Sequence, residues 1–151
     1  FDAEATDGFG PTDLYIVGGN GHVWQLVDDR WIMQDVPINS NLNAVKCAPN
    51  GLTYAAGSNG VLVYGRDDSW DVLLGEQLED EIWDLEWFRG KLFASTMEAV
   101  YVLENNNWTA VQFGNDTPVT CYQLSASESV LWSNGEYDIW EFNGQRWSRL
   151  I

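Results

Sequence analysis

Six carboxylates and two tryptophans gather in the segment GEQLEDEIWDLEW, which begins at Gly75. These residues are Glu76, Glu79, Asp80, Glu81, Asp84, Glu86, Trp83 and Trp87. Two carboxylates held roughly 5 to 9 Å apart can serve as the acid and the base of a glycosidase. If the segment ends in a strand, Asp84 and Glu86 lie on one side of it, about 7 Å apart. Any two acids in such a strand would meet that distance, so the pair by itself does not indicate catalysis.

The same eight residues suit the recognition of a basic protein better. An acidic rim with aromatic anchors is typical of a surface that binds a partner rich in Lys and Arg. We therefore predict a partner-binding site made of all eight residues. The alternative is a solvated acidic loop above a tryptophan core, in which the charges serve only solubility.

Other residues with reactive side chains are few. The chain has one histidine, His22, and two cysteines, Cys47 and Cys121, which cannot assemble a zinc or copper ligand set. A Ser-His-Asp or Cys-His centre would depend on His22, and no nucleophile elbow is present. Both cysteines lie in apolar runs and are predicted to be small buried residues without a disulfide. The sequence thus predicts a protein that is not an enzyme, with no catalytic residues, no metal site and no cofactor.

The charge balance narrows the choice of partners. Seven basic and 23 acidic side chains give a formal net charge of −16. Such a surface repels nucleic acid and anionic membranes and attracts a basic protein. No apolar run reaches the ~18 residues of a membrane span, and no secretory signal is visible. We therefore expect a cytoplasmic protein.

These residues lie within a sequence repeat, whose structure must set their positions. The phrases VDDRW, RDDSW, ENNNW and FNGQRW end at Trp31, Trp70, Trp108 and Trp147, which are 39, 38 and 39 residues apart. A short turn precedes each phrase, and the turns GGNG, GSNG, STME and SNGE keep the same period. Two independent features with one period indicate tandem structural repeats.

Each repeat has the pattern of four short strands. The second repeat shows it in the runs NAVKCAP, LTYAAG, VLVYGR and WDVLL, which are separated by turn residues. Asn-Gly and Asp-Asp pairs tolerate the positive φ angles of tight hairpins, whereas sustained helical spacing is absent. The sequence predicts an all-β fold, a β-propeller of four-stranded antiparallel blades, with the repeated tryptophans wedged between neighbouring blades.

The repeats run over about 1–38, 39–77, 78–115 and 116–151, as a single propeller domain or half of one. No strand is visibly shared between the two ends to close the ring. We expect the four blades to belong to a larger ring, completed either by further sequence or by self-association with a second copy. In this arrangement the loop from Glu76 to Glu81 joins two blades, on the ring face that carries the GSNG-type turns.

The units GGNGHVWQLVDDRW and GSNGVLVYGRDDSW resemble the propeller repeats known as WD40, YVTN or BNR-like. The stretch NLNAVKCAPNGLTYAAGSNGVLVYGRDDSWDVL, with IWDLEWFRGKLFASTMEAVYVLE, is similar to a family of bacterial propeller proteins, some of which are found beside polymorphic toxins. This resemblance implies a propeller fold and an immunity role. RDDSW lacks the glycine and the spacing of an Asp-box. The Gly-His and Trp-Asp pairs of WD40 blades occur only as Gly21-His22 and Trp83-Asp84.

Two functions follow as hypotheses. The first is a protein-binding propeller that acts as an immunity or antitoxin-like inhibitor of a basic toxin. The second is a lectin-like propeller that binds carbohydrate. Repeated units would then carry equivalent binding residues, but the four turns diverge in sequence, which favours the first hypothesis.

Overall fold

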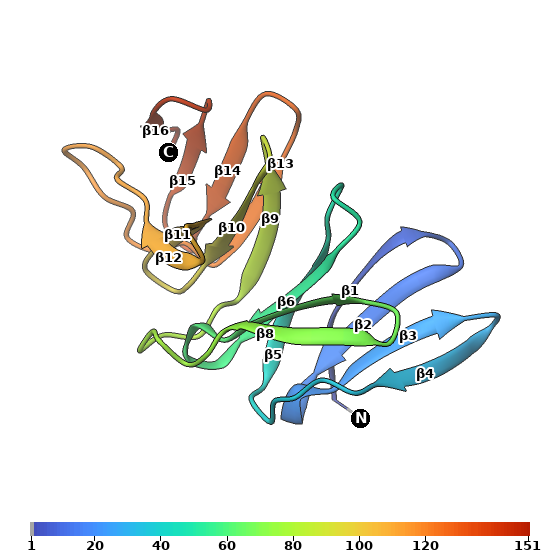
Figure 1. Ribbon diagram of the computed structural model, residues 1–151. Coiled ribbons are helices and arrows are strands. Elements are labelled where there is room, and N and C mark those ends of the chain that lie inside the picture. The colour runs from blue at the N-terminus through green and yellow to red at the C-terminus, as the bar shows by residue number, and fades with distance from the viewer. Residues whose placement is uncertain (1) are drawn as a thin grey trace. The chain divides into compact units, whose positions relative to one another are not determined.

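The computed structural model describes residues 2–151 and contains four separate four-stranded sheets (Figure 1). Phe1, with which the first predicted repeat begins, lies outside the described residues. In each sheet every strand pairs antiparallel with the next strand along the chain. Four short strands in each repeat are what the sequence predicts, and each sheet falls within one predicted repeat.

The chain divides into two compact units, the first ending at Ile82 and the second spanning Trp83–Ile151. The first unit holds the first sheet, with β1 (Ala3–Gly10), β2 (Asp13–Gly18), β3 (Val23–Val27) and β4 (Arg30–Gln34), and the second sheet, with β5 (Leu42–Cys47), β6 (Thr53–Gly57), β7 (Leu62–Arg66) and β8 (Ser69–Leu74). The second unit holds the third sheet, with β9 (Asp84–Phe88), β10 (Lys91–Ser95), β11 (Val100–Glu104) and β12 (Asn107–Ala110), and the fourth sheet, with β13 (Gln123–Ala126), β14 (Leu131–Asn134), β15 (Ile139–Phe142) and β16 (Trp147–Arg149). Among residues 2–151, no helix combines the length and the apolar character that crossing a membrane requires.

The repeated Asp-Asp and Asn-Asn pairs form tight hairpins between the third and fourth strands of a sheet. Asp28 and Asp29 have φ angles of 50° and 60°, and Asn105 and Asn106 have 50° and 57°. Asp and Asn tolerate this left-handed region better than other residues with a side chain. The phrase VDDRW is therefore a hairpin followed by the returning strand, as predicted.

The turns between the second and third strands have two lengths. In the first two sheets a single 3₁₀ turn fills them, η1 (Gly19–Gly21) and η2 (Ser58–Gly60). The Gly18 amide donates to the His22 carbonyl, four residues on, at 3.1 Å. In the third sheet the Thr96 amide reaches the Ala99 carbonyl, only three residues on, at 2.9 Å. Because the turn has one length in the first unit and a shorter one in the second, equivalent positions within each unit are 39 residues apart.

Packing between consecutive sheets forms the core of each unit. In the first unit, Tyr15, Val17 and Val23 of the first sheet pack against Trp70 and its apolar neighbours in the second. The Tyr15 and Trp70 rings meet edge to face, with 5.8 Å between centroids. In the second unit, Trp147 belongs to a cluster that joins the third and fourth sheets. Trp70 and Trp147 are thus the predicted wedges between neighbouring sheets.

Trp31, in contrast, is 44% exposed, so within this chain it does not wedge between two sheets. Trp31 lies opposite Leu26, on the face of the first sheet that points away from the Tyr15 packing. Its indole therefore has no neighbouring sheet of its own unit to pack against. Trp108 is half-buried.

Both cysteines are free, and neither is a reactive thiol. Cys121 is buried and Cys47 is half-buried. Burial raises the pKa of each thiol to about 11, so both remain protonated at neutral pH. Cys121 is therefore the small buried residue that was predicted, whereas Cys47 is only partly buried.

One buried carboxylate, Asp138, connects the segment that leads into the fourth sheet with the core of that sheet. Asp138 is 1% exposed, and it accepts hydrogen bonds from the Val119 amide at 2.8 Å and the Trp140 indole Nε1 at 3.1 Å. The Thr120 amide lies 3.4 Å away, and an Arg149 nitrogen lies 4.0 Å away. Burial pushes the pKa of Asp138 upward, but these donors outweigh it, so the pKa lies below its usual value.

We expect Asp138→Asn to destabilise the protein by about 1–3 kcal/mol at pH 7, because the amide cannot serve all of these donors. A lowered folded-state pKa gives stability that is complete above the unfolded pKa of about 4 and is lost as pH falls through the folded value. The difference in free energy of unfolding between wild type and variant should therefore become smaller below about pH 4. Urea unfolding at a series of pH values measures this difference.

Asp116→Asn is the matched control, because Asp116 is exposed and pairs with Arg149 at 3.3 Å on the surface. We expect it to change stability by less than about 0.5 kcal/mol. A gap between wild type and Asp138→Asn that stays constant down to pH 2 would contradict the role given to Asp138.

Candidate partner-binding site

Two opposite edges of the first unit carry its connections. The loop edge is made of residues 18–22, 35–41, 57–61 and 75–82. Its parts are joined by hydrogen bonds from the Asn20 amide to Asn41 Oδ1 at 3.0 Å and from the Leu78 amide to the Asn59 carbonyl at 2.8 Å. The hairpin edge is made of residues 10–13, 28–29, 48–52 and 66–68. Both edges are acidic, but only the loop edge carries residues that were predicted as site residues.

The loop edge carries the first four predicted site residues. Glu76, Glu79 and Asp80 are exposed, and Glu81 is half-buried. The Ser40 hydroxyl donates to Glu76 Oε1 at 2.7 Å, and Asn43 Nδ2 donates to Glu81 Oε2 at 3.2 Å. The two outer carboxylates of the run are therefore tied to the preceding loop and strand.

Close backbone packing fixes the position of this loop. The Ile82 amide donates to the Gly57 carbonyl at 3.0 Å. A Cβ on Gly57 would collide with the Asn41 carbonyl oxygen, and one on Gly60 would lie 2.6 Å from Leu78 Cγ. Both positions therefore require glycine because the loops approach so closely. The exposed carboxylates stand on a well-defined backbone.

The other four predicted residues belong to the second unit. Trp83 is 43% exposed and precedes β9. Asp84 Oδ2 accepts the Leu124 amide of β13 at 2.9 Å, and Glu86 Oε1 accepts the Trp87 amide at 2.9 Å. Asp84 therefore helps to hold the fourth sheet against the third. The eight predicted residues are divided between the two units, four in each.

The strand register of β9 confirms the predicted alternation. Asp84 pairs with Ser95 and Glu86 with Phe93, whereas Leu85 and Trp87 pair with residues of the other face. The two carboxylates share one side of the strand. Asp84 Oδ1 also accepts the Leu85 amide at 2.9 Å, so both oxygens of Asp84 serve backbone amides.

The hairpin edge contains an acidic hollow of about 440 Å³. Asp13, Asp28, Asp29 and Asp67 line it, together with the buried side chain of Gln25. From the sequence, Asp28, Asp29 and Asp67 are predicted only as turn residues, and no role is predicted for Asp13. The Asp-Asp pair recurs 39 residues later, at Asp67-Asp68, and consecutive sheets bring equivalent hairpins together. That recurrence was the signal that could have identified the hollow.

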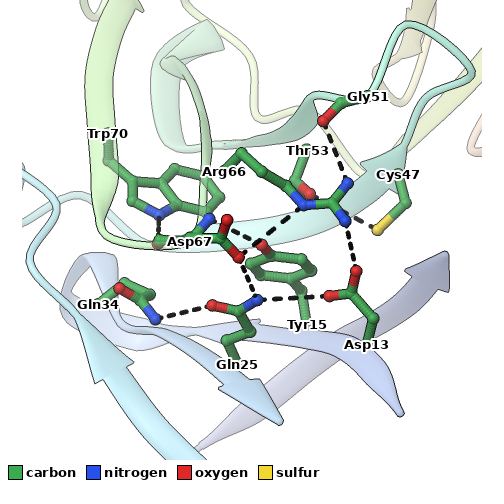
Figure 2. A network of polar contacts seen from close by, with 10 residues as sticks. All are labelled: Asp13, Tyr15, Gln25, Gln34, Cys47, Gly51, Thr53, Arg66, Asp67 and Trp70. Carbon is green, nitrogen blue, oxygen red and sulfur yellow. Dashed lines mark hydrogen bonds and ion pairs between the residues drawn. The ribbon is translucent and has the colours of Figure 1, made fainter. Parts of the chain in front are cut away.

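Arg66 braces one side of this hollow (Figure 2). Its guanidinium forms an ion pair with Asp13 and donates to the Gly51 carbonyl at 3.1 Å. The guanidinium carbon also lies 3.7 Å from the centre of the Phe9 ring, which is a cation–π contact. One positive charge thus connects both sheets of the first unit.

Gln25 forms the floor of the hollow, and Figure 2 shows its partners on both sides. Its Nε2 donates to Asp67 at 2.9 Å and to Asp13 at 3.3 Å, while its Oε1 accepts from Gln34 at 2.9 Å. The Asp67 amide donates to the Tyr15 hydroxyl at 3.0 Å, and burial raises the pKa of Tyr15. The polar groups of the floor are mutually satisfied, which orders the carboxylates above them.

The chemistry open to these acidic edges is the binding of cationic side chains. Within residues 2–151, no group of three or more His, Cys, Asp or Glu side chains could hold a metal ion. Carboxylates on an ordered backbone accept charge-assisted hydrogen bonds from Lys and Arg.

The equivalent place in the second unit is different. There a cavity of about 290 Å³ has an aromatic lining of Phe88, Phe93, Phe142 and Trp147. The hollow of the first unit is acidic and this one is largely apolar, although both lie between consecutive sheets. The two units do not repeat one binding site.

Known structures that resemble this chain identify its fold. No protein-family model matches the chain. It superimposes on the WD40 β-propeller domain of Doa1 with a TM-score of 0.67 and 15% identity, covering 99% of this chain and 53% of that one. It superimposes on YCF48 bound to D1 peptide with a TM-score of 0.69 and 13% identity, covering 97% and 52%. The predicted all-β propeller is confirmed, and the four sheets are its blades.

One sequence relative is much closer. The chain is 40% identical over 147 residues to Immune protein Tsi7 of Pseudomonas aeruginosa, which is 97% of this chain. The match covers 48% of the relative, so the chain spans about half the length of that protein.

We expect Arg66→Gln to lower stability by about 1–2 kcal/mol, because it removes the ion pair with Asp13, the bond to Gly51 and the contact with Phe9. Lys91→Gln is the matched control. Lys91 Nζ lies 2.6 Å from Glu104 Oε1 in a more exposed pair, and we expect a loss below about 0.5 kcal/mol. Urea midpoints of both variants make the comparison, and equal losses would show that Arg66 is only a surface charge.

Proposed function

We propose that this chain is a non-catalytic, protein-binding propeller that acts as an immunity protein and neutralises a basic toxin. The observation that carries the proposal is the 40% identity, across 97% of the chain, to Immune protein Tsi7. Because the chain spans only 48% of that relative, the shared activity is inferred for the propeller repeats rather than for a whole protein of that length.

The charge distribution supports a basic partner. The net charge of −16 attracts a cationic protein over long range and raises its rate of encounter. The loop edge contributes Asp35, Glu76, Glu79, Asp80 and Glu81 and contains neither Lys nor Arg. At the hairpin edge, by contrast, Arg66 neutralises part of the charge. We therefore propose the loop edge of the first unit as the surface that contacts the toxin. In the second unit, Trp83, Glu86 and Trp87 are proposed as further contact residues, whereas Asp84 holds two strands together.

The geometry at Asp84 argues against a catalytic role for this carboxylate. Its two carboxylate oxygens accept the Leu85 and Leu124 amides, each at 2.9 Å. A carboxylate engaged in this way holds two strands together. It is poorly suited to exchange protons with a substrate.

The carbohydrate-binding alternative has less support. Multivalent lectins present the same pocket in each repeated unit, whereas this chain places an acidic hollow and an aromatic cavity at equivalent positions. No specific observation favours it over the protein-binding role.

The test of function is protection of cells. Each protein encoded next to the gene for this chain would be expressed as a candidate toxin in a bacterial host, alone and together with the chain. We expect growth to stop with the first protein alone and to recover when the chain is present. We also expect the purified pair to bind with a nanomolar Kd that weakens as salt is raised. Unchanged killing in the presence of the chain would refute the immunity role.

The contact surface is tested by charge reversal. Changing Glu79, Asp80 and Glu81 to Lys should weaken toxin binding about a hundredfold, or about 3 kcal/mol, because three attractive contacts become repulsive. Calorimetry or surface plasmon resonance measures the Kd.

The matched control changes Asp28, Asp29 and Asp68 to Lys, which shifts the net charge by the same amount at the hairpin edge. We expect less than about a tenfold loss, from long-range electrostatics alone. If instead the hairpin variant releases the toxin and the loop variant does not, the contact lies at the acidic hollow and the loop-edge assignment is wrong.

A further inference from the structure

Three exposed apolar side chains lie on three connections of the second unit. Met97 is on the β10–β11 turn, Val119 on the β12–β13 connection and Tyr137 on the β14–β15 turn. Their exposed fractions are 45%, 54% and 65%. Single exposed apolar residues are ordinary, but several on adjoining segments indicate a surface that another protein covers. We call these three residues the apolar patch.

Hydrogen bonds hold the three connections together. The Cys121 amide donates to the Met97 carbonyl at 2.7 Å. The Glu136 amide donates to Thr120 Oγ1, also at 2.7 Å. Thr120 and Cys121 directly follow Val119 in the chain, so they join the connection that carries Val119 to both of the other turns. The three patch residues therefore stand on one continuous backbone surface.

The backbone beneath the apolar patch is well defined. Asp138 is 1% exposed and accepts the Val119 amide at 2.8 Å. A Cβ on Gly135 would collide with the Thr120 carbonyl oxygen, so the close approach of the two segments requires glycine at this position. An ordered surface of this kind loses little conformational entropy when it binds a partner.

The connection that carries Val119 is longer than its equivalent in the first unit. Residues 111–122 separate β12 from β13, whereas residues 35–41 separate β4 from β5. The early part of the longer connection belongs to the core, because the Phe113 ring centroid lies 5.2 Å from that of Trp140 and 4.7 Å from that of Trp147. Residues 114–119 are exposed, apart from the half-buried Pro118. Long connections of this kind commonly carry binding residues.

Carboxylates share these connections with the apolar patch. The segments 96–99, 111–122 and 135–138 carry Glu98, Asp116 and Glu136 on their surface and contain neither Lys nor Arg. Asp116 pairs with Arg149 at 3.3 Å, whereas Glu98 and Glu136 each adjoin a patch residue in the chain. An apolar centre with a polar rim is the usual arrangement of a protein interface. A rim of negative charge fits a partner whose own rim carries Lys and Arg.

We propose that the apolar patch is an anchor for the basic toxin, so that this inference rests on the proposed function. The surface that fits it is an apolar region of the toxin bordered by Lys and Arg. The carboxylates of the chain speed the encounter, whereas burial of Met97, Val119 and Tyr137 slows dissociation. Aromatic and Met side chains are enriched among the residues that act in this way.

The experiment measures association and dissociation rates by surface plasmon resonance. The probe is the protein, encoded next to the gene for this chain, that the wild-type chain binds. We expect Tyr137→Ala to weaken binding about tenfold or more, mainly through faster dissociation, and the double variant Met97→Ala with Val119→Ala to do the same. Because the lost contact is apolar, the factor should stay constant as salt is raised, in contrast to the effect of charge reversal.

The matched control is the double variant Met33→Ala with Val72→Ala. Met33 and Val72 are 53% and 39% exposed and lie on β4 and β8 of the first unit. We expect this control to change the Kd by less than about twofold. All changed residues are exposed, so every variant should fold, and circular dichroism with urea midpoints verifies this.

The outcomes separate this inference from the function on which it rests. A wild-type chain that binds none of the neighbouring gene products would overturn the proposed function and this inference with it. A wild-type chain that binds one of them, while Tyr137→Ala and the Met97–Val119 double variant bind equally well, would overturn this inference alone. A loss of binding that disappears as salt is raised would do the same, because it would show an electrostatic contact.

Discussion

Face-to-face packing of consecutive sheets is the interaction on which the rest of this structure depends. A four-stranded sheet alone cannot bury both of its faces. In the first unit the contact centres on the Tyr15 and Trp70 rings, 5.8 Å apart. Burying two such rings contributes several kcal/mol, on the order of 1.5–3 kcal/mol for each large side chain. The Tyr15 hydroxyl also accepts the Asp67 amide, so the apolar contact sets the position of a polar hairpin.

Much of the fold could be predicted because its signals are local. A hairpin such as Asp28-Asp29 needs positive φ angles that few residues tolerate, and the period of the hairpins reveals the repeat. The environment of each repeated tryptophan is not local. Trp31 and Trp70 occupy equivalent positions, yet only Trp70 has a sheet of its own unit against it. Sequence periodicity assigns them one role, whereas burial depends on what the chain places beside them.

The candidate site illustrates the same limit. The acids from Glu76 to Glu86 form one cluster in the sequence, but the structure gives them different roles. Glu79 and Asp80 face solvent on the loop edge, whereas Asp84 holds the Leu124 amide. The acidic hollow shows the opposite relation between sequence and structure. Its carboxylates are far apart in the sequence and converge only because consecutive sheets place equivalent hairpins together. The composition shows that the protein is acidic, but it does not show which carboxylates are free to bind a partner.

Different forces therefore act at the faces of the sheets and at the loop and hairpin edges, where the strands end. The faces packed together within each unit are apolar, and such contacts tolerate or favour salt because they bury little charge. The edges concentrate carboxylates that no sheet covers, and their attraction for a cationic protein falls as salt screens it. The packed faces order the backbone at the ends of the strands, as the hydrogen bond from the Asp67 amide to the Tyr15 hydroxyl illustrates. Within the first unit, face-to-face packing therefore leaves the acidic edges open to a partner of opposite charge.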